Sequence, residues 1–127
     1  MSNNPETVVR KLLELWATRD AEAMANLFAE DGVYLNVPTN TPMVGRQAVL
    51  EWLGFVFNHL ERIDVEVLHM MSKDDWVLSE RRDDHVFKDH TMPLPVMNAA
   101  QVVDGKITMW RDYYDHQTVV NAGVIDE

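Results

Sequence analysis

Apolar residues in the first half of the chain recur at the spacing of amphipathic helices. After Pro5 they predict a first helix, with the apolar positions Val8, Val9, Leu12, Leu13, Leu15 and Trp16. Residues 21–28 predict a second, short helix that Asp20 can cap. Residues 46–60 predict a third helix, with Val49, Leu50, Leu53, Phe57 and Leu60 along one side.

Alternation of apolar and polar residues predicts strands elsewhere. Residues 33–37 alternate after the break at Glu30-Asp31-Gly32, and a turn-rich loop follows at residues 38–45. Behind the third helix come further strand candidates, at residues 63–71, 76–87, 92–103 and 107–114. Short polar turns separate them, which predicts consecutive hairpins. Pro93 and Pro95 fit poorly in a central strand, so the 92–103 strand is expected to begin at an edge or a bulge.

These elements predict one α+β domain that occupies residues 1–127. A chain of 127 residues with 46% apolar content is ordinary for a single globular domain. Three to four helices are expected to cover one face of a strongly curved, mostly antiparallel sheet, which makes a cone around a deep apolar pocket. The sheet faces that these helices leave uncovered favour a homodimer.

Cysteine content and charge limit the classes of function. The chain has no cysteine, which excludes disulfides, thiolate zinc sites and cysteine nucleophiles and fits a cytoplasmic protein. Neither a signal peptide nor a membrane span is expected. A formal charge of −10 disfavours nucleic acid and anionic membranes as partners. The histidines lack metal-ligand spacing and the glycines form no phosphate-binding run, so neither a metal nor a nucleotide cofactor is expected.

Five polar residues stand in segments that otherwise read as buried strands: Tyr34, Asn36, Arg81, Asp83 and Asp112. Because side chains alternate along a strand, Tyr34 and Asn36 share a face, and so do Arg81 and Asp83. If the three segments converge, two carboxylates with an arginine, a phenol and an amide provide general acid and general base catalysis in one pocket.

Each group also has a purely structural interpretation. Arg81 and Asp83 can form an exposed ion pair, because their strand is charged on both faces, but Val77 and Phe87 on the same face favour a pocket. Tyr34 and Asn36 can simply satisfy each other or the backbone at a strand end. Asp112 shares its face with Trp110 and Tyr114, and a carboxylate buried between aromatic rings is uncommon enough to indicate function.

Three phrases of the sequence carry a family resemblance. They are Phe-Ala-Glu-Asp at 28–31 followed by Val-Tyr-Leu-Asn-Val-Pro at 33–38, Ser-Glu-Arg-Arg-Asp at 79–83, and Asp-Gly-Lys-Ile-Thr-Met-Trp-Arg-Asp-Tyr-Tyr-Asp at 104–115. In this order the chain resembles the limonene-1,2-epoxide hydrolases, within the group that shares the nuclear transport factor 2-like, or SnoaL-like, fold. Phe-Ala-Glu-Asp at 28–31 and the Gly45-Arg46 turn are common throughout the fold group, whereas the five polar residues resemble the hydrolase site.

The resemblance implies a cofactor-independent hydrolase that adds water to an apolar, cyclic or terpenoid-like epoxide and releases a vicinal diol. Asp112 would be the general base and Asp83 the general acid, with Arg81 between them. Tyr34 and Asn36 would hold the attacking water. The implied scheme needs no metal, cofactor or covalent ester, and the family is usually homodimeric.

The resemblance also gives candidates for the pocket wall: Leu13, Trp16, Phe57, Leu60, Leu94, Val96 and Tyr114. His85 continues the face of Arg81 and Asp83 and is an eighth candidate for substrate binding. The family leads us to expect an apolar residue at that position, so this departure bears on substrate preference. Tyr114 and Trp16 stand where a smaller or less polar side chain could also serve, so the preferred epoxide is expected to be smaller than, or shaped differently from, a monoterpene epoxide.

Two other classes of function remain open on the same fold. One is an isomerase or polyketide-cyclase-like enzyme with an aspartate base, which has no need of an arginine between two acids. The other is a non-catalytic small-molecule-binding domain, which leaves two buried acids without a purpose.

Overall fold

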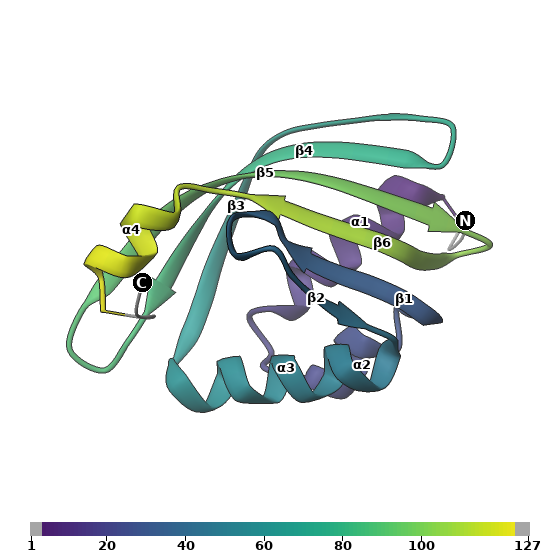
Figure 1. Cartoon of the computed structure of the whole chain (residues 1–127). Helices are drawn as coiled ribbons and strands as arrows, with labels where there is room; N and C mark the ends of the chain where they lie inside the picture. The colour runs from purple at the N-terminus through teal and green to yellow at the C-terminus, as the bar shows by residue number, and fades with distance from the viewer. Residues whose placement is uncertain (1–3, 124–127) are drawn as a thin grey trace.

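One curved sheet forms the body of the molecule (Figure 1). The computed structural model describes residues 4–123. The six strands lie in the order β2-β1-β6-β5-β4-β3. Their bounds are β1 Phe28–Asn36, β2 Thr41–Val44, β3 Arg62–Lys73, β4 Trp76–Val86, β5 Thr91–Val103 and β6 Lys106–Tyr113. Neighbouring strands are antiparallel except β1 and β6, which run parallel. The predicted α+β fold with a mostly antiparallel sheet is confirmed.

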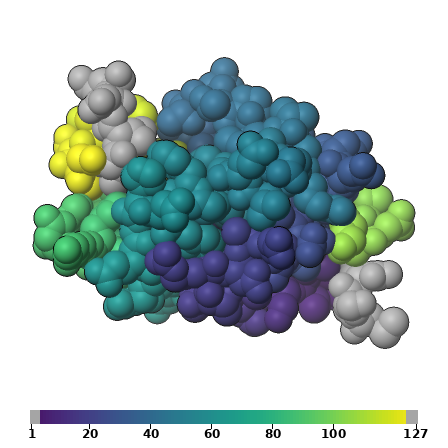
Figure 2. All heavy atoms as spheres, turned by 90° about the horizontal axis from the view of Figure 1, so that it is seen from below, coloured from purple at the N-terminus to yellow at the C-terminus, as the bar shows by residue number. Residues whose placement is uncertain are grey.

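Helices cover the inner side of this sheet. Their bounds are α1 Pro5–Leu15, α2 Ala21–Ala25, α3 Arg46–His59 and α4 His116–Asn121, and a 3₁₀ turn η1 spans Val37–Thr39. α1 packs against β3 to β6, and α3 packs against β1 and β2. Figure 2 shows the molecule from the helical side, with α3 lying across the middle of that face. The main core therefore lies between the sheet and these two helices.

The first helix forms where its sequence predicts. The side chain of Asn4 accepts a hydrogen bond of 2.9 Å from the backbone N–H of Glu6, and Pro5 occupies the first turn. Val9 and Leu12 are fully buried against the sheet. The amphipathic pattern thus fixes both the start of α1 and the face that packs.

The break at Glu30-Asp31-Gly32 lies inside β1 rather than before it. The pairing of β1 with β6 shifts register between Phe28 and Val33, as in a β-bulge. A Cβ atom on Gly32 would lie 2.6 Å from the carbonyl oxygen of Ile107, so the close approach of the two strands requires glycine. The prediction that the second helix extends to residue 28 was wrong, because α2 ends at Ala25 and Phe28 already pairs in β1.

Three elements were not located from the sequence. The segment expected as a loop at 38–45 contains the edge strand β2 and the end of η1. β2 pairs with β1 so that Val44 lies opposite Val33 and Thr41 lies opposite Asn36. α4 follows β6, with Asp115 accepting a hydrogen bond of 3.0 Å from the backbone N–H of Gln117. α4 packs on the beginning of β5, where Val119 contacts the cluster of Met92, Leu94 and Val96.

The prolines of β5 lie at an edge, as predicted. Residues 91–96 of β5 pair with β4, but pairing with β6 begins only at Met97. Pro93 and Pro95 therefore have a strand on one side only. Within residues 4–123, none of the helices is both long and apolar enough to cross a bilayer.

Candidate active site

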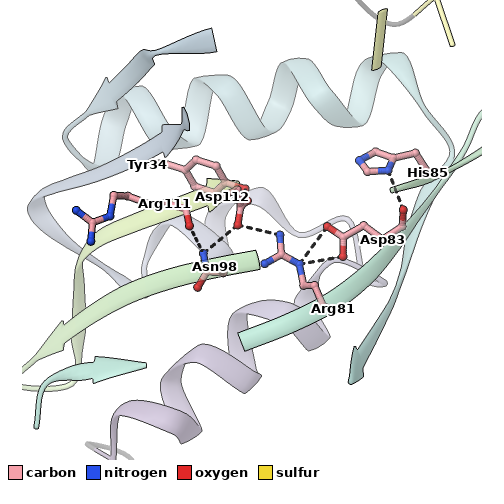
Figure 3. Close-up of polar contacts among 7 residues, drawn as sticks. All are labelled: Tyr34, Arg81, Asp83, His85, Asn98, Arg111 and Asp112. Atoms are coloured by element: carbon pink, nitrogen blue, oxygen red, sulfur yellow. Dashed lines mark hydrogen bonds and ion pairs between the residues drawn. The ribbon is translucent and has the colours of Figure 1, made fainter. Parts of the chain in front are cut away.

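A single guanidinium joins two buried carboxylates at the centre of the sheet (Figure 3). Arg81 Nε donates to Asp83 Oδ1 at 2.9 Å and to Oδ2 at 3.1 Å. On its other side, Arg81 Nη2 lies 3.0 Å from Asp112 Oδ1. Their exposed fractions are 1% for Arg81, 5% for Asp83 and 4% for Asp112, so all three groups are removed from bulk water. Charges buried this deeply must be paired.

Strand alternation places these groups on the inner face. Arg81 and Asp83 are two residues apart on β4 and point the same way. β5 separates β4 from β6, and Val96 of β5 lies opposite Arg81. The long arginine side chain is therefore what reaches across β5 to the carboxylate of Asp112.

Asp112 accepts hydrogen bonds from two further side chains. The hydroxyl of Tyr34 donates to Oδ2 at 2.9 Å, and Nδ2 of Asn98 donates to Oδ1 at 2.9 Å. Asn98 Nδ2 also donates to the carbonyl of Arg111 at 2.9 Å, which fixes the orientation of the amide. With Arg81 included, three donors hold this carboxylate in place.

Asn36 completes the group. The parallel pairing of β1 with β6 puts Asn36 next to Asp112 and Tyr34 next to Trp110. Asn36 lines the same cavity as Arg81, Asp83, Asp112 and Tyr34. The structure thus brings together the five polar residues that the sequence singled out.

Asn98 is a member of the cluster that sequence reasoning missed. It is 2% exposed and stands directly opposite Asp112 in the pairing of β5 with β6. A signal was present, because Asn98 follows the wall candidates Leu94 and Val96 at strand spacing and so shares their face. A polar residue at the end of an apolar strand face is a candidate for the site for the same reason as Asp112.

The cluster opens into a cavity of about 400 Å³ between the sheet, α3 and α4. Six of the eight proposed wall residues line it: Trp16, Leu60, His85, Leu94, Val96 and Tyr114. Several aromatic residues that sequence reasoning did not select also line it, among them Trp52. The ring centroids of Trp52 and Tyr34 are 4.5 Å apart. Such mostly apolar walls with a few converging polar groups are typical of a small-molecule site.

Two wall candidates lie elsewhere. Leu13 faces Val65 and Val67 of β3 and does not line the cavity. Phe57 packs edge-on against Trp16, with ring centroids 5.5 Å apart, and supports the wall without lining the cavity. Helical spacing identified both as buried but could not show which buried neighbours each would meet.

Burial sets the protonation of the cluster. It raises the pKa of the Asp83 carboxyl, although the charge and hydrogen bonds of Arg81 oppose this. Burial also works against the charge of Arg81, but the carboxylates of Asp112 and Asp83 outweigh it and raise the pKa of the guanidinium. Burial, followed by the charge of Asp112, raises the pKa of Tyr34 well above its ordinary value, so the phenol keeps its proton.

One proton shared between the two acids gives this cluster its chemistry. With Arg81 charged, one ionised carboxylate makes the group neutral, and the second can stay protonated in the low-dielectric interior. The raised pKa of Asp83 favours its protonated form. Two carboxyl groups that face one cavity are the kind of arrangement that general acid and base catalysis requires.

His85 lies at the edge of this cluster. Its Nδ1 is 3.2 Å from the backbone carbonyl of Asp83. Burial lowers the pKa of the imidazole, which favours the neutral ring. In residues 4–123, no group of three or more histidine, aspartate and glutamate side chains is arranged to hold a metal ion.

Solved structures share this fold. An LEH-like epoxide hydrolase from M. tuberculosis superposes with a TM-score of 0.79 and 24% identity over 90% of this chain and 84% of that one. A protein of ketosteroid isomerase-like fold from Catenulispora acidiphila, solved with trimethylamine, gives a TM-score of 0.82 and 22% identity over 90% of this chain and 89% of that one. A provisionally assigned SnoaL-like polyketide cyclase from Shewanella denitrificans gives a TM-score of 0.82 and 12% identity over 92% of this chain and 94% of that one.

At these identities the superpositions establish the fold and leave the reaction open. The sequence comparison is independent of them and covers most of the chain: the SnoaL-like domain matches residues 9–110, from α1 into β6. This chain therefore belongs to the SnoaL-like domain family.

Proposed function

We propose that the chain is an epoxide hydrolase that adds water to an apolar epoxide in one step and releases a vicinal diol. The observation that carries this proposal is the buried bridge from Asp83 through Arg81 to Asp112 at the end of an apolar cavity. The fold that the chain shares with the LEH-like epoxide hydrolase from M. tuberculosis is compatible with it.

Asp112 is the proposed general base. It pairs with Arg81 and accepts hydrogen bonds from Tyr34 and Asn98, which hold its oxygens in fixed directions. Asn36 lies next to it at the cavity. A water between Asn36, Tyr34 and Asp112 loses a proton to Asp112 as its oxygen attacks an epoxide carbon.

Asp83 is the proposed general acid. Burial raises its pKa, which favours a protonated carboxyl that donates to the epoxide oxygen as the carbon–oxygen bond breaks. The new carbon–oxygen bond forms with the water oxygen, and both oxygens end as hydroxyls. After turnover Asp112 holds a proton and Asp83 has lost one, so the proton returns through solvent or the Arg81 bridge before the next cycle.

The arginine between the two acids distinguishes this proposal from the isomerase or cyclase alternative. Removing a proton beside a carbonyl needs one carboxylate base and a neutral donor, for which the Tyr34 hydroxyl or a protonated carboxyl would suffice. Such an enzyme has no need of Arg81 bonded to both acids. A non-catalytic binding domain would in addition keep two acids buried at considerable free-energy cost.

The test is diol formation in ¹⁸O water. Cyclohexene oxide, limonene oxide and styrene oxide are incubated with excess protein and EDTA, and the diol from the first turnover is analysed by mass spectrometry. We expect ¹⁸O in the first diol, because water attacks carbon directly. An ester intermediate would instead deliver an unlabelled carboxylate oxygen in the first turnover.

Single variants then assign the roles. Asp83→Asn and Asp112→Asn should each lower the single-turnover rate by at least about 10³-fold, because each removes a proton donor or acceptor from the transition state. Asp84→Asn, the next residue on β4 with a partly exposed side chain paired to Arg82, is the matched control and should retain the rate. Full hydrolase activity in Asp83→Asn would refute the acid assignment.

A further inference from the structure

His85 is a polar residue in an apolar part of the cavity. It lies two residues after Asp83 on the inner face of β4. Its partners in the neighbouring strands are Ile63 of β3 and Met92 of β5, which are 3% and 4% exposed. A half-buried imidazole among such neighbours needs hydrogen-bond partners for its ring nitrogens.

One ring nitrogen has its partner inside the protein. Nδ1 lies 3.2 Å from the carbonyl oxygen of Asp83, and because a carbonyl only accepts, Nδ1 carries the proton. Burial lowers the pKa of the imidazole and favours the neutral ring, although the charge of Asp83 and the backbone groups of Asp83 and Met92 favour the charged ring. Nε2 of a neutral ring protonated at Nδ1 is a hydrogen-bond acceptor.

The accepting nitrogen has no hydrogen-bond partner among residues 4–123. Figure 3 shows it on the side of the ring away from the Asp83 carbonyl, and His85 lines the cavity. The acceptor is therefore available to a molecule bound there. His90, a second imidazole at this end, is exposed and paired with Asp89 instead.

The spacing between His85 and Asp83 along β4 indicates where a substrate would carry a hydrogen-bond donor for His85. Two residues along a strand correspond to roughly 6.6 Å, from a rise of about 3.3 Å per residue. A ligand that places its epoxide oxygen at Asp83 therefore brings the opposite side of its ring system to His85. A hydroxyl group there has a proton to donate to Nε2, whereas a hydrocarbon leaves this nitrogen unpaired.

We propose that His85 Nε2 accepts a hydrogen bond from the substrate, and that the substrate is an epoxide bearing a hydroxyl group across its ring from the oxirane. The part of this inference that makes the substrate an epoxide rests on the proposed function. The recognition of a hydroxyl by His85 stands on the geometry of the cavity alone.

A structural role for His85 predicts a different outcome. If the imidazole serves only to hold the Asp83 carbonyl, Nδ1 matters and Nε2 does not. Two variants separate the nitrogens: the amide of His85→Asn can replace the Nδ1 donor but removes the distal acceptor, and His85→Gln provides an acceptor near the position of Nε2.

The experiment compares cyclohexene oxide with 4-hydroxycyclohexene oxide. The measured quantity is the ratio of the two kcat/KM values, which cancels changes common to both substrates. We expect the wild type and His85→Gln to favour the hydroxylated epoxide about fivefold to tenfold, as one hydrogen bond provides. In His85→Asn the ratio should fall to near one. Equal ratios in all three proteins, with both epoxides opened, would overturn the inference and leave the hydrolase proposal intact.

A binding measurement decides the inference if neither epoxide is opened. Calorimetric titration with cyclohexanecarboxamide and its 4-hydroxy derivative measures the same preference without turnover. Tighter binding of the hydroxylated amide to the wild type, lost in His85→Asn and kept in His85→Gln, would support His85 as the hydroxyl acceptor while the hydrolase proposal fails. No difference between the two amides would overturn the inference.

Discussion

Asp83 and Asp112 lie on strands that are not neighbours, yet each is bonded to the same guanidinium. Arg81 Nε serves Asp83 and Nη2 serves Asp112, at 2.9 Å and 3.0 Å. The two acids are therefore coupled through one fixed cation, and the proton held by one affects the charge of the other. A lysine could not bridge them, because an ammonium is a point charge without the planar fork.

Removal of the bridge should damage both activity and stability. Arg81→Met leaves the buried acid pair of Asp83 and Asp112 without its countercharge, so we expect a loss of about 3–5 kcal/mol in the free energy of unfolding. The hydrolysis rate should fall more than about 100-fold, because both acids lose their orientation. Urea unfolding and single-turnover rates measure the two effects.

Arg82→Met is the control for this change. Arg82 is the next residue on β4, and its pairing with Asp84 lies at the surface, where ion pairs contribute little. Its urea midpoint and rate should match the wild type. Equal behaviour of the two variants would mean that Arg81 does not hold the acids.

Asn98 is expected to act as a positioning residue. It contacts Asp112 and the Arg111 carbonyl. Asn98→Ala should lower kcat about 10-fold to 100-fold with little change in KM, as loss of a residue that orients a reacting group does. Gln101→Ala is the control, because Gln101 lies on the same strand but bonds to Thr108. A change in KM alone would assign Asn98 to substrate binding instead.

The pH dependence should report on Asp83. Burial raises its pKa above the ordinary 3.8, so the acid keeps its proton further toward neutral pH. We expect kcat to fall on the alkaline side as this proton is lost. The folded chain also holds a proton that the unfolded chain has released, so the free energy of unfolding should fall as pH rises from about 3.8 through the raised pKa.

Asp83→Asn removes this titration. Subtracting its unfolding free energy from that of the wild type, measured in urea from pH 3 to 8, should give a difference that declines with pH over that window. A difference that rises with pH would mean that Arg81 dominates burial and lowers the pKa of Asp83.

Strand alternation explains why the polar cluster could be found in the sequence. Arg81 and Asp83 share a face at any register, because the period of two is a property of the backbone. The cluster also needed the pairing of β1 with β6, which joins distant segments in parallel. Neither the local pattern nor the family resemblance predicted that pairing; the resemblance implied only that Tyr34, Asn36 and Asp112 meet around one water.

Tertiary packing explains what the sequence pattern could not provide. Leu13 and Trp16 both belong to the apolar side of α1, yet Trp16 lines the cavity and Leu13 meets β3. The short strand β2 is mostly exposed, so it lacks the alternation that reveals a half-buried strand. Asn98 looks like an ordinary polar residue until β6 brings Asp112 opposite to it.

Replacing glycine by alanine should have opposite effects on stability at Gly32, in the bulge of β1, and at Gly54, in α3. Gly32→Ala puts a Cβ 2.6 Å from the Ile107 carbonyl oxygen, so the two strands must separate. We expect a loss of about 2–3 kcal/mol in stability, as for overpacking in a core. Gly54 lies in α3 with nothing within 4 Å of an added Cβ, so Gly54→Ala should stabilise the protein by up to about 1 kcal/mol. Thermal unfolding of both variants is the measurement, and a stable Gly32→Ala would show that β1 and β6 can move apart freely.

The outer face of the sheet carries exposed apolar side chains on adjacent strands. Leu78 of β4 pairs with Met71 of β3, and Met97 of β5 pairs with Tyr113 of β6. Their exposed fractions range from 44% for Tyr113 to 65% for Met71. No helix packs on this face among the elements described in residues 4–123. We propose that a second copy of the chain covers it, because a two-fold interface needs only one self-complementary surface.

Charge placed on this face should separate the two copies. Met97→Glu puts carboxylates from both subunits close together at such an interface, where like charges repel in a low dielectric. Sedimentation equilibrium should then show a dimer for the wild type and a monomer for Met97→Glu. Val44→Glu is the control, because Val44 is 63% exposed on β2, away from this face. A wild type that sediments as a monomer at all concentrations would reject the dimer, and a dimer that survives Met97→Glu but not Val44→Glu would move the interface to the β2 edge.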